Sequence, residues 1–200
     1  GDRHMSYRIL RAAKNRYGAT NEIGVFEMDD TGLREVPNPS QMLLEGRLTE
    51  EPGTCVTCVM EGARPVLAEV QALLTPTSFG TPRRSTNGFD YNRAMLLMAV
   101  LEKRGGLAVN TCDAYLNVIG GLYLDEPGAD LAAILALASS FRDRPVPADV
   151  VAIGEVGLTG ELRSVSALNQ RLSEVRRLGF TKCLVPQRHG RESIVPPDGL

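Results

Sequence analysis

Two short motifs at predicted junctions between secondary-structure elements constrain this fold most. The first is Asp-Glu-Pro-Gly-Ala-Asp at residues 125–130, where Pro127 starts a predicted helix that runs to Phe141 with an apolar stripe. The second is Gly-Glu-Val-Gly-Leu-Thr-Gly-Glu-Leu at residues 154–162, at the end of a predicted buried strand over Val150–Val156.

Hydrophobic periodicity predicts strands and helices that do not alternate strictly. Two hairpins are expected, one over residues 23–36 around an Asp-Asp-Thr-Gly turn and one over residues 54–75 around Glu-Gly-Ala-Arg. The other expected elements are a short helix after residues 37–40, helices over 91–104 and 167–178, and strands over 114–119 and 182–185. This order predicts an α/β or α+β two-layer domain rather than a doubly wound parallel sheet.

The length of the chain suits one main domain. Its 200 residues are 43% hydrophobic, which is enough to bury a substantial core. Residues 1–5, Gly-Asp-Arg-His-Met, resemble the remnant of an expression tag. We interpret residues 6–22 as a linker, residues 23–190 as the domain, and residues 191–200 as a tail without a motif, for which disorder is one expectation.

The sequence lacks the features of a membrane or secreted protein. No apolar run approaches the roughly 18 residues that span a bilayer, and no basic leader with an apolar core is present. The four cysteines, at positions 55, 58, 112 and 183, are too sparse for a disulfide framework in a chain of this length. The sequence therefore predicts a soluble, cytoplasmic domain without membrane contact.

Cys55 and Cys58 form a Cys-x-x-Cys pair, which is half of many zinc sites. The surrounding residues favour a strand, in which residues three apart point to opposite faces. No second pair follows, and His189 is the only histidine outside the tag-like residues. We therefore expect structural cysteines and no metal site.

The motifs at residues 125–130 and 154–162 resemble those of the Lon protease family. That family carries a nucleophilic serine in Asp-Gly-Pro-Ser-Ala-Gly and a lysine base after Gly-Glu-Val-Thr-Leu-x-Gly. The alignment places Gly128 at the position of the serine and Asn169 at that of the lysine, so the hydroxyl and the amine of the dyad are both absent. The resemblance implies the ribosomal protein S5 domain 2-like fold without peptidase activity. Asp125 and Glu126 are interpreted as helix-capping acids.

A further set of motifs resembles the RadA (Sms) family of bacterial DNA repair and recombination proteins. Residues 14–18, Lys-Asn-Arg-Tyr-Gly, are similar to that family's Lys-Asn-Arg-Phe-Gly, with Tyr17 in place of phenylalanine. Three other segments also read like that family's Lon-like domain: Thr81–Arg84, Asp90–Arg93 and Ser140–Pro145. The resemblance spans roughly Ser6 to His189.

The RadA resemblance implies a larger protein. In that family a zinc finger and a RecA-like ATPase core precede the Lon-like domain, and the whole is a hexameric, ATP-driven motor. It binds single-stranded or double-stranded DNA and promotes branch migration beside the RecA recombinase. ATP, Mg²⁺ and zinc would belong to the full-length protein, whereas this chain lacks a P-loop motif and is expected to hold no cofactor.

Charge is unevenly distributed although the net charge is only −2. Residues 8–16 contain four basic side chains and no acid, whereas residues 22–51 contain eight acids against two arginines. Clustered cations can bind phosphates even in an acidic chain, although a solvated helix face is the simpler interpretation.

The loop residues Lys14, Asn15, Arg16, Tyr17 and Gly18 are the sharpest of these candidates. The lysine is a point charge, the guanidinium can fork two phosphate oxygens, and the glycine lets the backbone turn closely beside them. The family ties this loop to ATP-driven work on DNA. Arg16 is therefore expected to contact either a neighbouring subunit's nucleotide or DNA, and the sequence leaves both roles open.

The other candidate DNA-binding residues are Arg83, Arg84, Arg93, Arg104, Arg142 and Arg144. The first two lie in a predicted flexible loop that suits contacts to a nucleic-acid backbone, and the next two would extend this surface along the following helix. The last two lie near a helix C-terminus, where cations are favourable in any case. Simple solvation or salt bridges between subunits remain alternatives for all six.

Two other functions remain open at this stage. The chain could be a peptidase with a displaced nucleophile, such as Ser139 or Ser140. It could also be a pure assembly module that forms a ring without touching DNA. Loss of hydrolysis on serine replacement would support the first alternative, and a stable ring without DNA affinity would support the second.

Overall fold

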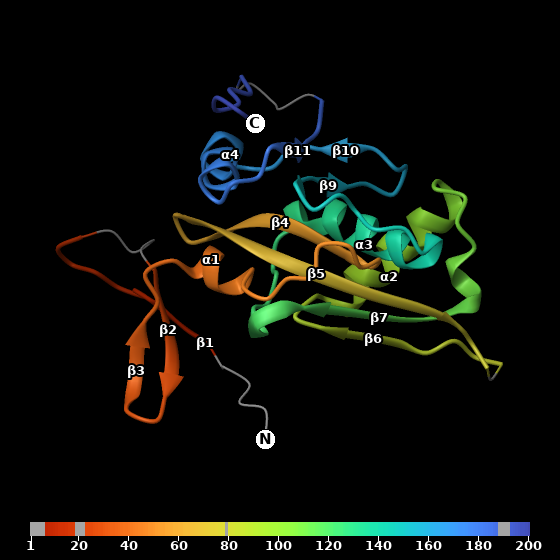
Figure 1. Ribbon diagram of the computed structural model, residues 1–200, viewed down its shortest axis with the longest axis horizontal. Coiled ribbons are helices and arrows are strands. Elements are labelled where there is room, and N and C mark those ends of the chain that lie inside the picture. Colours follow the sequence, from red (N-terminus) through yellow and green to blue (C-terminus); the bar gives the residue numbers. More distant parts are fainter. Residues whose placement is uncertain (1–6, 19–22, 79, 188–192) are drawn as a thin grey trace.

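The computed structural model describes residues 7–18, 23–78, 80–187 and 193–200, and these residues form three separate sheets (Figure 1). The tag-like residues, residues 19–22 and His189 lie outside the described parts. The strands are β1 (Tyr7–Arg11), β2 (Ile23–Asp29), β3 (Gly32–Glu35), β4 (Thr54–Glu61), β5 (Arg64–Pro76), β6 (Arg84–Asn87), β7 (Cys112–Val118), β8 (Val150–Ala152), β9 (Glu155–Val156), β10 (Leu162–Arg163) and β11 (Lys182–Leu184). The helices are α1 (Pro39–Leu43), α2 (Tyr91–Lys103), α3 (Asp130–Arg142) and α4 (Leu168–Arg177), with 3₁₀ turns η1 (Val109–Thr111), η2 (Ile119–Gly121) and η3 (Pro127–Ala129).

The larger sheet has six strands in the order β11-β8-β4-β5-β7-β6. β5 pairs antiparallel with both β4 and β7, whereas β6, β8 and β11 pair parallel with their neighbours. Together with the covering helices this gives the expected mixed α/β domain, with the ribosomal protein S5 domain 2-like fold of Lon C-terminal domains.

The two faces of this sheet bury two separate hydrophobic clusters. Residues of β4, β5 and β7 pack with α2 and α3 in the larger cluster, and residues of β4, β5 and β8 pack with α4 in the smaller one. Cys55 belongs to the larger cluster and Cys58 to the smaller one, which confirms that these cysteines point to opposite faces of β4. The strand therefore forms part of two cores.

Of the remaining strands, β9 and β10 form a two-stranded antiparallel sheet. The other three form the antiparallel sheet β1-β2-β3, which projects from the body of the molecule at the lower left of Figure 1. The β2–β3 hairpin and the β4–β5 hairpin match the sequence predictions, as do helices α2 and α4. The expected linker is different, because its residues 7–11 form strand β1, which pairs with β2 from Tyr7 opposite Glu27 to Arg11 opposite Ile23. The basic loop thus connects two paired strands.

One predicted strand divides into two. Residues 150–156 form β8 and β9 with a break at Gly154, because the backbone of this glycine bonds to the segment that starts α3. The Gly154 N–H donates to the Gly128 carbonyl at 2.9 Å, and the Gly154 carbonyl accepts from the Leu131 N–H at 3.1 Å. These two hydrogen bonds therefore hold the motif at residues 125–130 against the motif at residues 154–162.

Candidate functional site

The position that aligns with the Lon serine is tightly packed. Gly128 lies buried in η3, directly before α3. A Cβ atom at this residue would lie 3.1 Å from Arg171 Nη1, 3.2 Å from Val165 Cγ1 and 3.4 Å from Glu126 Oε1. A serine hydroxymethyl group here would therefore be wedged against a charged pair rather than face an open cleft.

Arg171 of α4 is the largest fully buried side chain beside this position. Its Nε donates to the Ser166 carbonyl at 2.9 Å and its Nη1 to the Cys58 carbonyl at 2.8 Å. Both terminal nitrogens also donate to the carboxylate of Glu126, at 2.8 Å from Nη2 to Oε2. A guanidinium keeps its proton in proteins and cannot act as the base of a dyad. The arginine therefore ties β4, η3 and α4 together.

The structure gives Glu126 a role other than the expected helix cap. Its side chain makes no capping hydrogen bond to η3. Instead its Oε1 accepts from the Met60 N–H at 3.2 Å in addition to the fork from Arg171. The capping interpretation is wrong for this residue because a buried guanidinium offers the carboxylate a stronger, charge-assisted partner.

Asn169 stands at the position of the Lon lysine and binds the C-terminal tail. Its Nδ2 donates to the Ser193 carbonyl at 3.0 Å, and its Oδ1 accepts from the Val195 N–H at 2.9 Å. Arg176 adds a hydrogen bond from Nε to the Asp198 carbonyl at 2.8 Å. Residues 193–200 therefore lie against α4.

Ser139 and Ser140 use their hydroxyls to bind backbone. Ser139 Oγ accepts from the Gly53 N–H at 2.8 Å and donates to the Arg144 carbonyl at 2.5 Å. Ser140 Oγ accepts from the Leu74 N–H at 2.9 Å. These bonds tie α3 to the segments around β4 and β5, and the Ser139 proton is given to a carbonyl rather than to a base. The geometry does not favour a displaced nucleophile.

Arg93 was a candidate for DNA binding, but the structure pairs it with a buried acid. Its Nε donates to Asp130 Oδ1 at 2.9 Å, its Nη2 donates to Oδ2, and Asp130 Oδ2 also accepts from the Val156 N–H at 3.0 Å. Burial raises the pKa of Asp130, and these hydrogen bonds oppose that rise. The fork holds α2 against the start of α3.

A small cleft of about 220 Å³ lies beside this pair. Its walls combine the apolar side chains of Phe89, Leu124 and Pro127 with Arg93 and three acids, Asp90, Asp125 and Glu126. Three carboxyl groups against one paired arginine disfavour a phosphate ligand. The cleft beside Arg93 and Asp130 is therefore not suited to binding DNA.

Arg84 is held by backbone carbonyls. The expected flexible loop contains strand β6, whose Arg84 pairs with Ala114 of β7. The guanidinium donates to the Cys112 carbonyl and, at 3.3 Å and 3.4 Å, to the carbonyls of Asn110 and Val109. Arg84 is therefore part of a paired strand rather than of a flexible loop, and its guanidinium is engaged by carbonyls at the end of η1.

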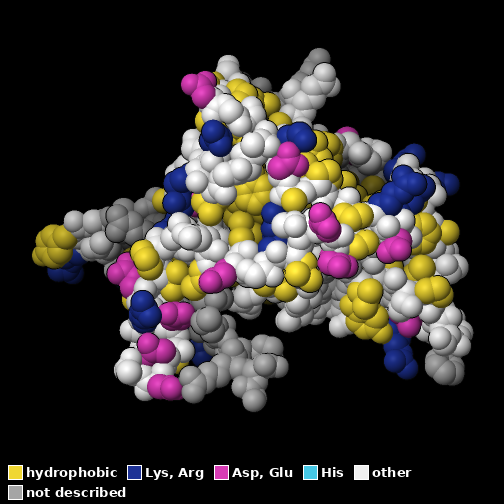
Figure 2. Space-filling view, viewed as in Figure 1, with side chains coloured by type: hydrophobic (Ala, Val, Ile, Leu, Met, Phe, Trp, Pro, Cys, Tyr) yellow, Lys and Arg dark blue, Asp and Glu magenta, His cyan; other side chains and the backbone are white. Residues whose placement is uncertain are grey.

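Four other candidate arginines are exposed, namely Arg83, Arg104, Arg142 and Arg144. Arg83 is held only through its backbone, whose N–H donates to Asp113 Oδ1 at 2.7 Å. Arg104 lies beside the β9–β10 turn, since a Cβ on Gly160 would be 3.2 Å from Arg104 Cβ. In Figure 2 basic and acidic side chains are interspersed over the visible face, with a larger basic group at the upper right.

The Lys-Asn-Arg-Tyr-Gly loop is fully presented to solvent. All five residues are exposed, and Tyr17 is 93% exposed. Asn15 shapes the loop by accepting the Tyr17 N–H with its Oδ1 at 3.1 Å, and a Cβ on Gly18 would lie only 2.7 Å from Asn15 Nδ2. Among the described residues, no interaction was found that joins this loop to any of the six other candidate arginines.

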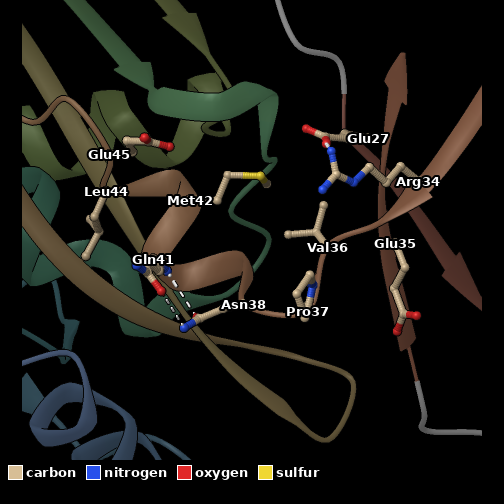
Figure 3. A pocket seen from close by; sticks show the side chains of 10 residues that line it. All are labelled: Glu27, Arg34, Glu35, Val36, Pro37, Asn38, Gln41, Met42, Leu44 and Glu45. Carbon is tan, nitrogen blue, oxygen red and sulfur yellow. Dashed lines mark hydrogen bonds and ion pairs between the residues drawn. The ribbon is translucent and has the colours of Figure 1, made fainter. Parts of the chain in front are cut away.

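A groove of about 700 Å³ separates the three-stranded sheet from α1 (Figure 3). It is lined by Glu27, Arg34 and Glu35 from the strands and by Met42 and Glu45 from the α1 segment, among others. Arg34 lies 3.9 Å from Glu27, so one of the acids is partly balanced. The remaining carboxylates make this groove unsuitable for a phosphate backbone.

Three cysteines are held as thiols, and the described residues offer no metal centre. Burial raises the pKa of Cys55 and of Cys183 to about 12 and also raises the pKa of Cys58, which disfavours the reactive thiolate. Within residues 7–18, 23–78, 80–187 and 193–200, no group of three or more His, Cys, Asp or Glu side chains could hold a metal ion. No helix in the same parts of the chain is long and apolar enough to cross a membrane.

The signal that sequence analysis missed is Arg171. It occupies the apolar stripe of α4, between Leu168 and the pair Leu172 and Val175, all of which are buried. An arginine at helical spacing within such a stripe must be buried, and a buried arginine needs an acidic partner. That pattern predicts a buried ion pair, and the fold identifies Glu126, the acid directly before Pro127, as the partner.

Comparison with known proteins identifies the relatives of this fold. Residues 112–198 match the family of Lon protease (S16) C-terminal proteolytic domains. The chain is 56% identical over 187 residues to the DNA repair protein RadA of Streptococcus pneumoniae, covering 94% of this chain and 44% of that protein. It is 57% identical over 187 residues to the DNA repair protein RadA of Bacillus subtilis, covering 93% of this chain and 41% of that protein.

These matches extend over nearly all of the chain. A third relative, the DNA repair protein RadA of Streptococcus pyogenes serotype M1, is 53% identical over 200 residues and matches the whole chain. The chain nevertheless spans less than half the length of these relatives, at 41–44%. Over the portion that it spans, the chain therefore matches RadA DNA repair proteins and carries a Lon C-terminal-like domain.

Proposed function

We propose that this domain is a non-proteolytic Lon-like module that serves a RadA-type motor as a hexameric scaffold and a DNA-binding surface. The observation that carries the first part is the packing of Gly128 against the fork between Arg171 and Glu126. A site filled by an always-protonated guanidinium has neither a nucleophile nor a base. The domain is therefore retained for binding or assembly.

The DNA-binding part of the proposal rests on cations that the fold leaves exposed. These are Lys14 and Arg16 in the basic loop and the arginines Arg83, Arg104, Arg142 and Arg144. Exposed guanidinium and ammonium groups suit contacts to the phosphate backbone, which position DNA without reading its sequence. A ring repeats each contact in every subunit, so weak contacts add up.

The rest of the proposed machine lies outside this chain. The RadA resemblance supports a full-length protein that uses ATP and Mg²⁺, holds zinc, acts beside the RecA recombinase and works in the cytoplasm on single-stranded or double-stranded DNA. Arg16 would then contact either DNA or a neighbouring subunit's nucleotide. The exposure of the whole loop is compatible with both.

The direct test is the salt dependence of DNA binding by this chain. Labelled single-stranded and duplex DNA would be titrated between 50 and 200 mM salt, with Lys14→Ala/Arg16→Ala and Arg83→Ala variants. Arg34→Ala is the matched control, since it removes an exposed arginine from the acidic sheet. Three phosphate contacts predict about a 40-fold loss of affinity for duplex DNA over this salt range.

Each outcome assigns a role. Salt-sensitive binding that is weakened by the basic-loop or Arg83 variants, and not by the control, supports the DNA surface. Binding that none of the variants changes would contradict it. A stable ring in sedimentation experiments without DNA affinity would favour the pure assembly module. The six exposed cations would then only make the domain more soluble.

A further inference from the structure

The β1-β2-β3 sheet carries apolar side chains on both faces. Its inner face packs on the domain through Ile9 and Val25, which lie with Leu43 of α1 around a small apolar space. On the outer face, Leu10 is 54% exposed, Met28 50% and Leu33 52%. An antiparallel sheet with one solvated face normally alternates apolar and polar residues, so this outer face is unusual.

The outer apolar residues form one continuous strip. Met28 pairs directly with Leu33 across the hairpin, and Phe26 lies on the same face two residues before Met28. Leu10 stands opposite Gly24, whose missing side chain leaves room for the Phe26 ring, because a Cβ there would lie 2.6 Å from Phe26 Cε2. The strip therefore runs across all three strands.

The charges on this face do not point to nucleic acid. The strand pairing places Arg8 and Glu35 on either side of Phe26, so the face carries one cation and one anion beside its apolar strip. A balanced, apolar strip suits the apolar surface of another folded unit. The groove between this sheet and α1 separates part of the inner face from the domain, so the sheet is attached along only part of that face (Figure 3).

We propose that the apolar strip of Leu10, Phe26, Met28 and Leu33 is an interdomain surface, covered in the longer protein by the part of the RadA relatives that this chain lacks. The chain spans only 41–44% of those relatives, so more than half of their length is available to cover the strip. A sheet with two apolar faces is a middle layer, which needs a unit packed on each side. This inference depends on neither DNA binding nor ring formation.

Methionine oxidation tests the proposal with a native probe. Hydroxyl radicals would be applied to this chain and to a longer form that includes the missing segment, and the sulfoxide at each methionine would be measured by mass spectrometry. Met28 should be oxidised readily in the short chain and several-fold more slowly in the long one. Met98, which is 6% exposed, is the control and should stay protected in both.

Two results would overturn the proposal. Equal oxidation of Met28 in the two forms would mean that the missing segment does not cover the strip. Protection of Met28 in the short chain that increases with protein concentration would mean that a second copy covers it. As an independent variant, Leu33→Ser should leave the stability of the short chain nearly unchanged and destabilise the longer form, and the same effect in both would also contradict the proposal.

Discussion

Arg171 and Arg83 show two opposite uses of the same guanidinium. The first is fully buried and donates to two carbonyls and to both carboxylate oxygens of Glu126. The second is exposed, and its backbone bonds to the Asp113 carboxylate and to the Ala114 N–H. A buried arginine without its acid would be very costly, whereas an exposed one can exchange water for a phosphate. The difference separates the residues that hold the fold from those available for DNA.

The largest effect is expected at the buried arginine. Arg171→Met leaves Glu126 without its cation and should lower the free energy of unfolding by about 3–5 kcal/mol. Arg177→Met on the same helix removes an exposed ion pair to Glu174 and should cost less than about 1 kcal/mol. Urea unfolding of both variants measures the difference, and similar values for the two would break the comparison.

Restoring the dyad residues should not restore hydrolysis. In Gly128→Ser/Asn169→Lys the serine meets the Arg171 fork, and the lysine loses the two hydrogen bonds that Asn169 makes to the tail. The double variant should leave an unfolded casein-like substrate intact and lose roughly 1–3 kcal/mol of stability, at about 0.5–1.5 kcal/mol for each lost hydrogen bond. Detectable hydrolysis would show that the site is less closed than its packing indicates.

Glu69 is a buried acid, the counterpart of the buried Arg171. It is 2% exposed, and none of the ion pairs found among the described residues includes it. Burial raises its pKa above the ordinary 4.5, and the hydrogen bond from Gln71 partly offsets that rise. A raised folded pKa means that ionisation costs stability as the pH rises.

Glu69→Gln should therefore stabilise the chain at pH 7. The gain should be on the order of 1 kcal/mol, within the range common for stabilising substitutions. It should shrink as the pH falls through the raised folded pKa of Glu69 and be absent below the ordinary value of 4.5, where the carboxyl is protonated in both the folded and the unfolded chain. Chemical unfolding at pH 7 and at pH 4 measures both values. A loss of stability at pH 7 would indicate that the charged form is the one the fold prefers.

The smallest effect is expected at an exposed pair. Hydrogen bonds from Lys182 and Thr181 hold the pKa of Asp149 below its ordinary 3.8. A lowered folded pKa adds stability above the unfolded pKa, and this contribution is lost as the pH falls through the folded value. Asp149→Asn should cost a little at pH 7 and nothing well below pH 3.8. A large loss of stability at pH 7 would show that exposed ion pairs stabilise this fold more than we expect.

Alternating and helical patterns in the sequence predicted most elements because burial imposes those periods. The two hairpins and helices α2 and α4 follow from such patterns. β6 does not, since Arg-Ser-Thr-Asn has no apolar alternation and becomes a strand only because β7 offers it an edge. β1 was similarly missed because its partner β2 lies across the basic loop.

The site was predicted at the level of aligned positions rather than contacts. The motifs located Gly128 and Asn169, but the neighbours that fill the first and engage the second come from distant parts of the chain. Arg84 and Arg93 were grouped with Arg83 because sequence shows charge and not acceptors. Only the fold reveals that carbonyls surround one and a buried aspartate faces the other.

The adjacent residues Arg83 and Arg84 allow the most direct test of this division. Stability and salt-dependent affinity for duplex DNA would be measured for Arg83→Ala and Arg84→Ala side by side. The first should reduce the salt slope by about 0.9 for one lost phosphate contact and keep the unfolding free energy. The second should keep the DNA affinity and lose about 1–3 kcal/mol of stability, because the part-buried carbonyls of Cys112 and Val109 lose their donor. Wild-type DNA binding by Arg83→Ala, or weakened binding by a fully stable Arg84→Ala, would contradict the account.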